Sequence, residues 1–69
     1  MNMKEKSLGG NIKEIRIANN LTQKQFGEIL GYAPRTVSDW EISKNEPSIS
    51  TLKLICKKFN VSYDEILDY

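Results

Sequence analysis

The chain has 69 residues, of which 39% are hydrophobic and 28% are charged, as expected for one small globular domain and not for a disordered chain. Ten basic and nine acidic residues give a net charge of +1, so charge alone does not indicate a nucleic-acid partner. Histidine, the commonest general base, is absent. Cys56 is the single cysteine, which excludes an internal disulfide and is expected to act as a small buried hydrophobe. We therefore expect no enzyme, no metal and no cofactor.

Apolar runs in this sequence are too short for a signal peptide or a membrane span, and a cytoplasmic protein is expected. Residues 1–6 are polar and charged without helical periodicity, which predicts a flexible tail. A first helix is predicted over about Leu8–Asn19, because Leu8, Ile12 and Ile15 have the spacing of a core-facing stripe. Gly9 and Gly10 weaken its first turn, and Ile17 points away from the stripe, where it is either exposed or part of a contact surface.

A second helix is indicated by a capping box, in which Thr22 is the N-cap and Gln25 follows three residues later. Gly31 ends this helix, because glycine reaches the left-handed conformation that a C-terminal turn needs. Gly27 lies inside the helix, where glycine costs about 0.5–1 kcal/mol relative to alanine. We expect this glycine to allow close approach of the next helix.

Pro34 opens the next helix at the first position, where a missing N–H costs nothing. A helical wheel predicts an inner side formed by Ala33, Val37, Trp40 and Glu41. The opposite side is formed by Arg35, Ser38, Asp39 and Ile42. Phe26, Leu30, Val37 and Trp40 can then meet in a core, while a polar helix face remains exposed. Such a face suits insertion into a DNA major groove.

The remaining chain predicts two further helices and no strand, so the fold class is all-α. After a loop, Ser48 or Ser50 can cap a fourth helix that ends near Phe59. A short fifth helix follows, with Ser62 and Glu65 as its capping box.

These motifs together resemble the DNA-binding domain of the lambda-type Cro/cI repressors, the Xre family of regulators. The matching segments are Ile12-Lys13-Glu14-Ile15-Arg16, Leu21-Thr22-Gln23, Gly27, Leu30-Gly31, Thr36-Val37-Ser38, Trp40-Glu41, Pro47, Thr51-Leu52 and 61–67. The resemblance implies a compact five-helix, lambda-repressor-like domain over residues 7–69, with a central helix-turn-helix. It also implies a sequence-specific DNA-binding transcriptional regulator.

The resemblance assigns DNA contacts to eight positions of this chain: Gln23, Pro34, Arg35, Thr36, Ser38, Asp39, Lys44 and Asn45. Gln23 is expected at a phosphate, although glutamine is also a good helix former in an exposed first turn. Arg35 can pair with guanine O6 and N7, or form an ion pair with Asp39 one turn later, or do both. Lys44 and Asn45 are expected at the sugar-phosphate backbone, with a solvated loop lysine as the alternative.

Three residues depart from the pattern of the family. Ala33 stands where a capping hydroxyl is usual, and Pro34 replaces a polar base contact with an apolar one, suited to a thymine methyl. Ser43 occupies a position that is usually glycine in the family, so the backbone of this loop is expected to be free to differ from that of relatives. The resemblance further implies a partly buried ion pair between Arg16 and Glu41, which would join the first helix to the third.

The expected partner is a double-stranded DNA operator, without a membrane or a small-molecule ligand. One helix reads few base pairs, so a homodimer on a palindromic operator is expected, with half-sites about 34 Å apart. Repression is the commoner outcome in the family. The near-neutral charge keeps open a different class of function, an antitoxin-like module that binds another protein. The chain can be either a complete small regulator or the N-terminal domain of a longer repressor.

Overall fold

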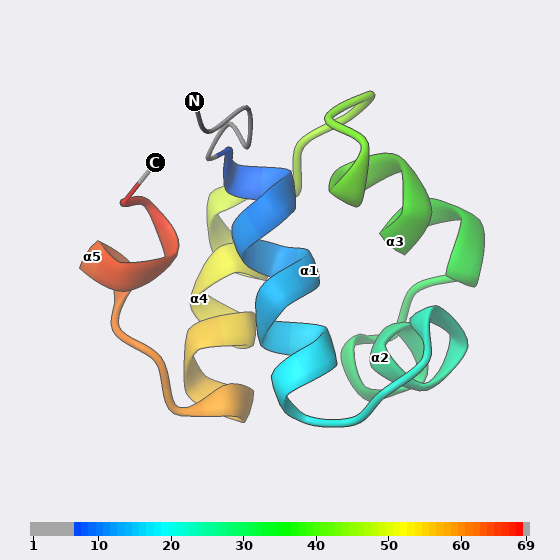
Figure 1. Cartoon of the computed structure of the whole chain (residues 1–69), viewed down its shortest axis with the longest axis horizontal. Coiled ribbons are helices and arrows are strands. Elements are labelled where there is room, and N and C mark those ends of the chain that lie inside the picture. The colour runs from blue at the N-terminus through cyan, green and yellow to red at the C-terminus, as the bar shows by residue number, and fades with distance from the viewer. Residues whose placement is uncertain (1–6, 69) are drawn as a thin grey trace, which may run out of the picture.

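The computed structural model describes residues 7–68, which form five helices. These are α1 (Leu8–Ala18), α2 (Gln23–Leu30), α3 (Pro34–Glu41), α4 (Ile49–Phe59) and α5 (Tyr63–Ile66). Figure 1 shows the α2–α3 pair on one side of α1 and α5 on the other. No strand occurs among the described residues, and the predicted all-α, five-helix fold is confirmed. The tail predicted at residues 1–6 lies outside the described part of the chain.

Side-chain caps fix the beginning of every described helix except α3. The hydroxyl oxygens of four N-cap residues each accept a hydrogen bond from a backbone N–H in the first turn: Ser7, Thr22, Ser48 and Ser62. Ser48, not Ser50, is thus the cap of α4. The N-cap of α3 is Ala33, which gives no side-chain hydrogen bond, and Pro34 stands at the start of the helix. The preset φ of proline compensates in part for the missing cap.

A single hydrophobic core joins all five helices. Its buried residues are Leu8, Ile12, Phe26, Leu30, Val37, Trp40, Leu52, Ile55 and Ile66. The Phe26 ring stacks on Phe59 with centroids 4.9 Å apart. Cys56 packs against the same core but is half-buried and not fully buried as expected, and this burial raises the pKa of its thiol. The core predicted around Phe26, Leu30, Val37 and Trp40 is therefore present.

Two glycines are required by close backbone approaches. A Cβ on Gly27 would collide with the carbonyl oxygen of Tyr32 and would lie 3.3 Å from Cγ2 of Val37. The predicted close approach is therefore made by the turn as well as by α3. A Cβ on Gly9 would collide with the carbonyl oxygen of Trp40. Gly9 thus lets α1 cross the C-terminal end of α3, a role that the sequence did not indicate.

The short α5 is attached to α1 by one buried side chain. Nδ2 of Asn11 donates to the carbonyl oxygens of Ile66 and Asp68, at 3.0 and 3.1 Å. The side chain of Ile66 is itself buried in the core. Among residues 7–68, none of the helices has the length and apolar character needed to cross a membrane.

Candidate nucleic-acid interface

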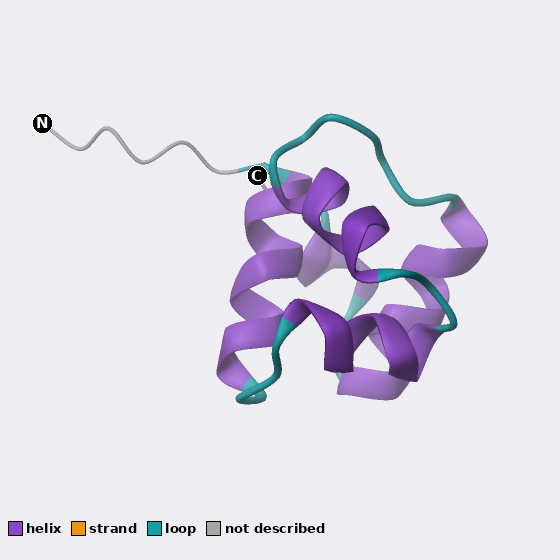
Figure 2. Ribbon diagram, turned by 90° about the vertical axis from the view of Figure 1, so that its right-hand side faces the viewer, coloured by secondary structure: helices purple, strands orange, loops and turns teal. Residues whose placement is uncertain are grey.

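Helix α3 buries one side and exposes the other. Val37 and Trp40 are buried, and the opposite side carries Arg35, which is exposed, with Ser38 and Asp39, which are half-buried. Figure 2 views the molecule from the side on which α2 and α3 lie. Pro34 is exposed and Thr36 is half-buried at the N-terminal end of the helix. The start of α3 is therefore open to a ligand while its inner side is held by the core.

Arg35 and Asp39 form an ion pair on this surface. Nε of Arg35 lies 3.6 Å from Oδ1 of Asp39, which is close enough for an ion pair and too long for a hydrogen bond. The Arg35 side chain is 78% exposed, and that of Asp39 is 16% exposed. Because the guanidinium group stays mostly in water, the ion pair leaves its donors accessible. Pairing with Asp39 and contact with a base are therefore compatible.

Arg16 and Glu41 are joined by two hydrogen bonds between α1 and the C-terminal end of α3. Nε of Arg16 donates to Oε2 of Glu41 at 2.6 Å, and Nη2 donates to Oε1 at 3.1 Å. Nη1 donates to the carbonyl oxygen of Leu21 at 2.9 Å. The two side chains are only 13% and 3% exposed, and the hydrogen bond to Glu41 raises the pKa of Arg16. This ion pair fixes the end of α3 relative to α1.

Gln23 belongs to the same network. Its Nε2 donates to Oε1 of Glu41 at 3.1 Å, so the first residue of α2 is hydrogen-bonded to the last residue of α3. The amide retains a second N–H and an oxygen, which suffice for a further partner. Sequence reasoning missed this contact, because the two residues lie 18 positions apart and no periodic pattern relates them.

The loop after α3 is held by the backbone of Asp39. The backbone N–H groups of Lys44 and Asn45 both donate to the carbonyl oxygen of Asp39, at 2.9 and 3.3 Å, while their side chains are exposed. Ser43 has φ +63°, in the left-handed region that favours glycine. The loop thus has a glycine-like backbone at a serine. Asp39 brings Arg35, Lys44 and Asn45 to one part of the surface.

The turn between α2 and α3 is anchored by Tyr32, which sequence reasoning did not assign to the site. Its hydroxyl lies 2.7 Å from Oγ1 of Thr51 on α4, and its ring packs edge-on against Trp40 with centroids 5.0 Å apart. These contacts, together with the network at Glu41, hold α3 at both ends. A rigid helix with a polar outer face behind a tight glycine turn defines a DNA-binding helix-turn-helix domain.

The chain belongs to the helix-turn-helix family of the Xre and Cro/cI type, whose family model matches residues 12–66. The family consists of DNA-binding domains and not of enzymes. This membership confirms the resemblance drawn from the sequence motifs.

Two solved structures that share the fold contain DNA. The P22 c2 repressor protein, in complex with a synthetic operator, is 27% identical with a TM-score of 0.82, and the match covers 91% of this chain and 96% of that one. PlcR of Bacillus thuringiensis, in complex with the peptide PapR7 and DNA, is 32% identical with a TM-score of 0.75. That match covers 90% of this chain and 22% of PlcR.

Two curated relatives have different functions. The antitoxin PezA of Streptococcus pneumoniae is 38% identical over 60 residues, which are 87% of this chain. The transcriptional activator BcrR of Enterococcus faecalis is 39% identical over 56 residues, or 81% of this chain. The matched regions span 38% of PezA and 28% of BcrR, so both relatives extend well beyond this domain.

Proposed function

We propose that this chain is a sequence-specific transcriptional regulator that reads a palindromic operator with α3 in the major groove. The observation that carries the proposal is the exposed Arg35, paired with Asp39 on a helix whose other side is buried. The planar guanidinium can donate two hydrogen bonds to guanine O6 and N7. Asp39 orients it and is also an acceptor suited to a cytosine amino group.

The neighbouring positions of α3 complete the base-reading surface. Ser38 and Thr36 supply hydroxyl groups to a base edge or a phosphate, and Pro34 supplies an apolar contact to a thymine methyl. Gln23 donates its second amide N–H to a phosphate at the start of α2, where the helix N-terminus also attracts an anion. Lys44 and Asn45 contact the backbone of the adjoining DNA from the loop after α3.

A homodimer is the proposed DNA-bound form, because one helix reads too few base pairs for selectivity in a genome. The similarity to the P22 c2 repressor on its operator supports repression. The similarity to BcrR makes activation the alternative outcome at the same kind of site. Ile42 and Ile17, which are 67% and 54% exposed, are candidates for the dimer contact, and α5 is a further candidate.

The proposal is tested by selecting bound sequences from random duplex DNA with wild type, Arg35→Ala and Lys53→Ala. Lys53 is an exposed lysine on α4, so its replacement removes the same charge away from α3. Wild type and Lys53→Ala should enrich one palindromic consensus with half-sites about 34 Å apart. Arg35→Ala should lose one base preference, equivalent to about 1–3 kcal/mol of discrimination. No enrichment at low salt would refute DNA reading by this chain.

A second candidate function is an antitoxin-like module that binds another protein and meets DNA only secondarily. The observation that favours it is the 38% identity with the antitoxin PezA. In that case, substitutions on the polar face of α3 should leave DNA binding unchanged. The selection with Arg35→Ala therefore separates the two functions.

A further inference from the structure

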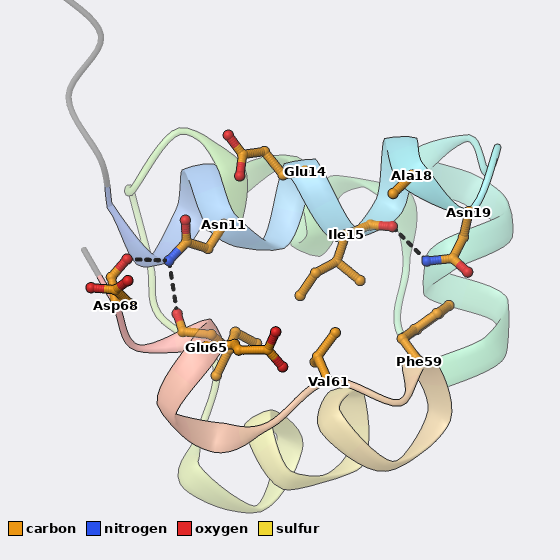
Figure 3. Close-up of a pocket in the computed structure, with 10 residues that line it drawn as sticks. Asn11, Glu14, Ile15, Ala18, Asn19, Phe59, Val61, Glu65 and Asp68 are labelled. Carbon is orange, nitrogen blue, oxygen red and sulfur yellow. Dashed lines mark hydrogen bonds between the residues drawn. The ribbon is translucent and has the colours of Figure 1, made fainter.

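A groove is lined by residues of α1, the end of α4 and the α5 segment (Figure 3). Figure 1 shows α5 on the side of α1 opposite to α3. The volume of the groove is about 530 Å³. Its apolar lining is formed by Ile15, Ala18, Phe59, Val61 and Ile66. Figure 3 shows the side chains of Ile15 and Val61 turned toward one another across the groove, with Phe59 at the end of the groove near Asn19. Such a lining can receive an apolar side chain.

Among the described residues, the charged side chains of the groove lining are all acidic, and lysine and arginine are absent from it. Glu65 and Asp68 line the α5 side of the groove, and Glu14 lines its α1 side. Glu65 is ionised at neutral pH, because its hydrogen bonds with Ser62 hold the pKa of its carboxyl below the usual value. An apolar floor beside carboxylates is complementary to a ligand that combines an apolar group with a cation.

We propose that this groove is the docking site for a basic amphipathic helix of a second protein. One apolar side chain of that helix lies between Ile15 and Val61, and a lysine or arginine one turn away pairs with Glu65 or Asp68. Tyr63 on α5 and Leu67 directly after it are exposed apolar side chains of the same segment of the chain. The site is separate from α3, so the proposal does not depend on how the chain reads DNA.

A second copy of the chain fits the groove less well. In a two-fold dimer whose axis passes through the groove, Glu65 and Asp68 would face the acidic residues of the same groove in the other copy. Like charges at an interface oppose association. A basic partner removes this repulsion and uses the charge of the groove.

The test uses two helical peptides of about 15 residues with the same leucine stripe, one with lysine and one with glutamate at the polar positions. Each is titrated into the ¹⁵N-labelled chain and followed by NMR. The lysine peptide should shift the side-chain amide of Asn11 and the backbone amides of Ile15 and Val61, and the glutamate peptide should not. Ala18→Trp fills the groove from its exposed edge and should abolish the shifts while the chain still unfolds cooperatively.

Matched variants separate the groove from general acidity. Asp68→Lys should weaken the lysine peptide about three- to tenfold at low salt, the size expected for reversing one exposed ion pair. Asp64→Lys makes the same charge change on α5 outside the groove lining and should change the affinity by less than about twofold. Equal losses in the two variants, or binding of the glutamate peptide, would overturn the proposal. Concentration-dependent shifts at the groove without peptide would also overturn it and assign the groove to a second copy.

Discussion

Glu41 is the residue that joins the three helices of the candidate site, because its carboxylate accepts from Arg16 and from Gln23. Replacing Glu41 with alanine would leave the Arg16 guanidinium without its anionic partner at 13% exposure. We expect the free energy of unfolding to fall by about 3–5 kcal/mol, a large share of the about 5–15 kcal/mol typical of folded proteins. Urea denaturation measures this loss.

Two controls accompany the Glu41→Ala measurement. Asp39→Ala breaks the ion pair on the exposed side of α3 and should cost less than about 1 kcal/mol. Replacing both buried partners, Arg16→Met with Glu41→Leu, should recover most of the stability, because no charge is then left unpaired. A decrease of less than about 1 kcal/mol in the free energy of unfolding of Glu41→Ala would mean that water solvates the Arg16 guanidinium in place of Glu41.

For single residues of the candidate site, the sequence predicted a contact where helical spacing or a family motif determines it. Arg35 and Asp39 are four residues apart on one helix, so their ion pair followed from helical spacing. The pairing of Arg16 with Glu41 was reached only through resemblance to a family. The hydrogen bonds of Gln23 to Glu41 and of Tyr32 to Thr51 were missed, because the crossing of the helices sets them and local sequence does not.

At the scale of the elements, Gly9 determines how α1 meets α3. On helix propensity alone, replacing Gly9 with alanine would be expected to stabilise α1. Because a Cβ here would collide with the carbonyl oxygen of Trp40, Gly9→Ala should instead lower the free energy of unfolding by about 1–3 kcal/mol. Gly10→Ala is the matched control, since its Cβ meets only the Ser7 hydroxyl oxygen at 3.2 Å. Equal thermal stability of the two variants would show that α1 shifts without cost.

The capping box of α5 predicts a local response to acid. Hydrogen bonds with Ser62 hold the pKa of Glu65 below its usual value in the folded chain. A depressed folded pKa means that this contribution to stability is fully present above the pKa of the unfolded chain and is lost as the pH falls through the pKa of the folded chain. The Ile66 N–H donates to the carbonyl oxygen of Ser62. Its protection from hydrogen exchange should therefore decrease in wild type as the pH falls through the folded pKa of Glu65, and should decrease less in Glu65→Gln.

The capping box of α2 is the internal control for this experiment. Thr22 and Gln25 make the same pair of hydrogen bonds without an ionisable group. Protection of the Phe26 N–H, which bonds to Thr22, should not follow the acid titration of Glu65. An equal loss at both helices would indicate global unfolding instead of local loss at α5.

Helix ends were predictable because they depend on residues within one turn. The caps at Thr22 and Ser62, and the proline start of α3, were all recognisable in the sequence. The angle between α1 and α3 could not be predicted, because in the sequence Gly9 indicates only a weak helix former. The groove beside α5 likewise arises from three helices that meet, with Asn11 connecting α1 to the end of the chain.

At the scale of the whole molecule, the near-zero net charge sets the strength of DNA association. Between Thr22 and Pro47 the basic residues are Lys24, Arg35 and Lys44, opposed by four acidic ones. If Arg35 reads a base, Lys24 and Lys44 remain to neutralise about two phosphates per subunit. The logarithm of the affinity should then fall with the logarithm of salt concentration with a slope of about −4 for a dimer.

Two lysine variants test whether the basic residues on the α2–α3 side are the ones that contact DNA phosphates. Lys44→Ala should reduce the magnitude of the dimer slope by about 2, one phosphate for each subunit, while leaving the preferred sequence unchanged. Lys57→Ala, on the exposed side of α4, should leave the slope as it is. A wild-type slope steeper than about −8 would require more cations than the α2–α3 side holds. The DNA would then also contact the lysines of α4, and the interface would not be confined to the α2–α3 side.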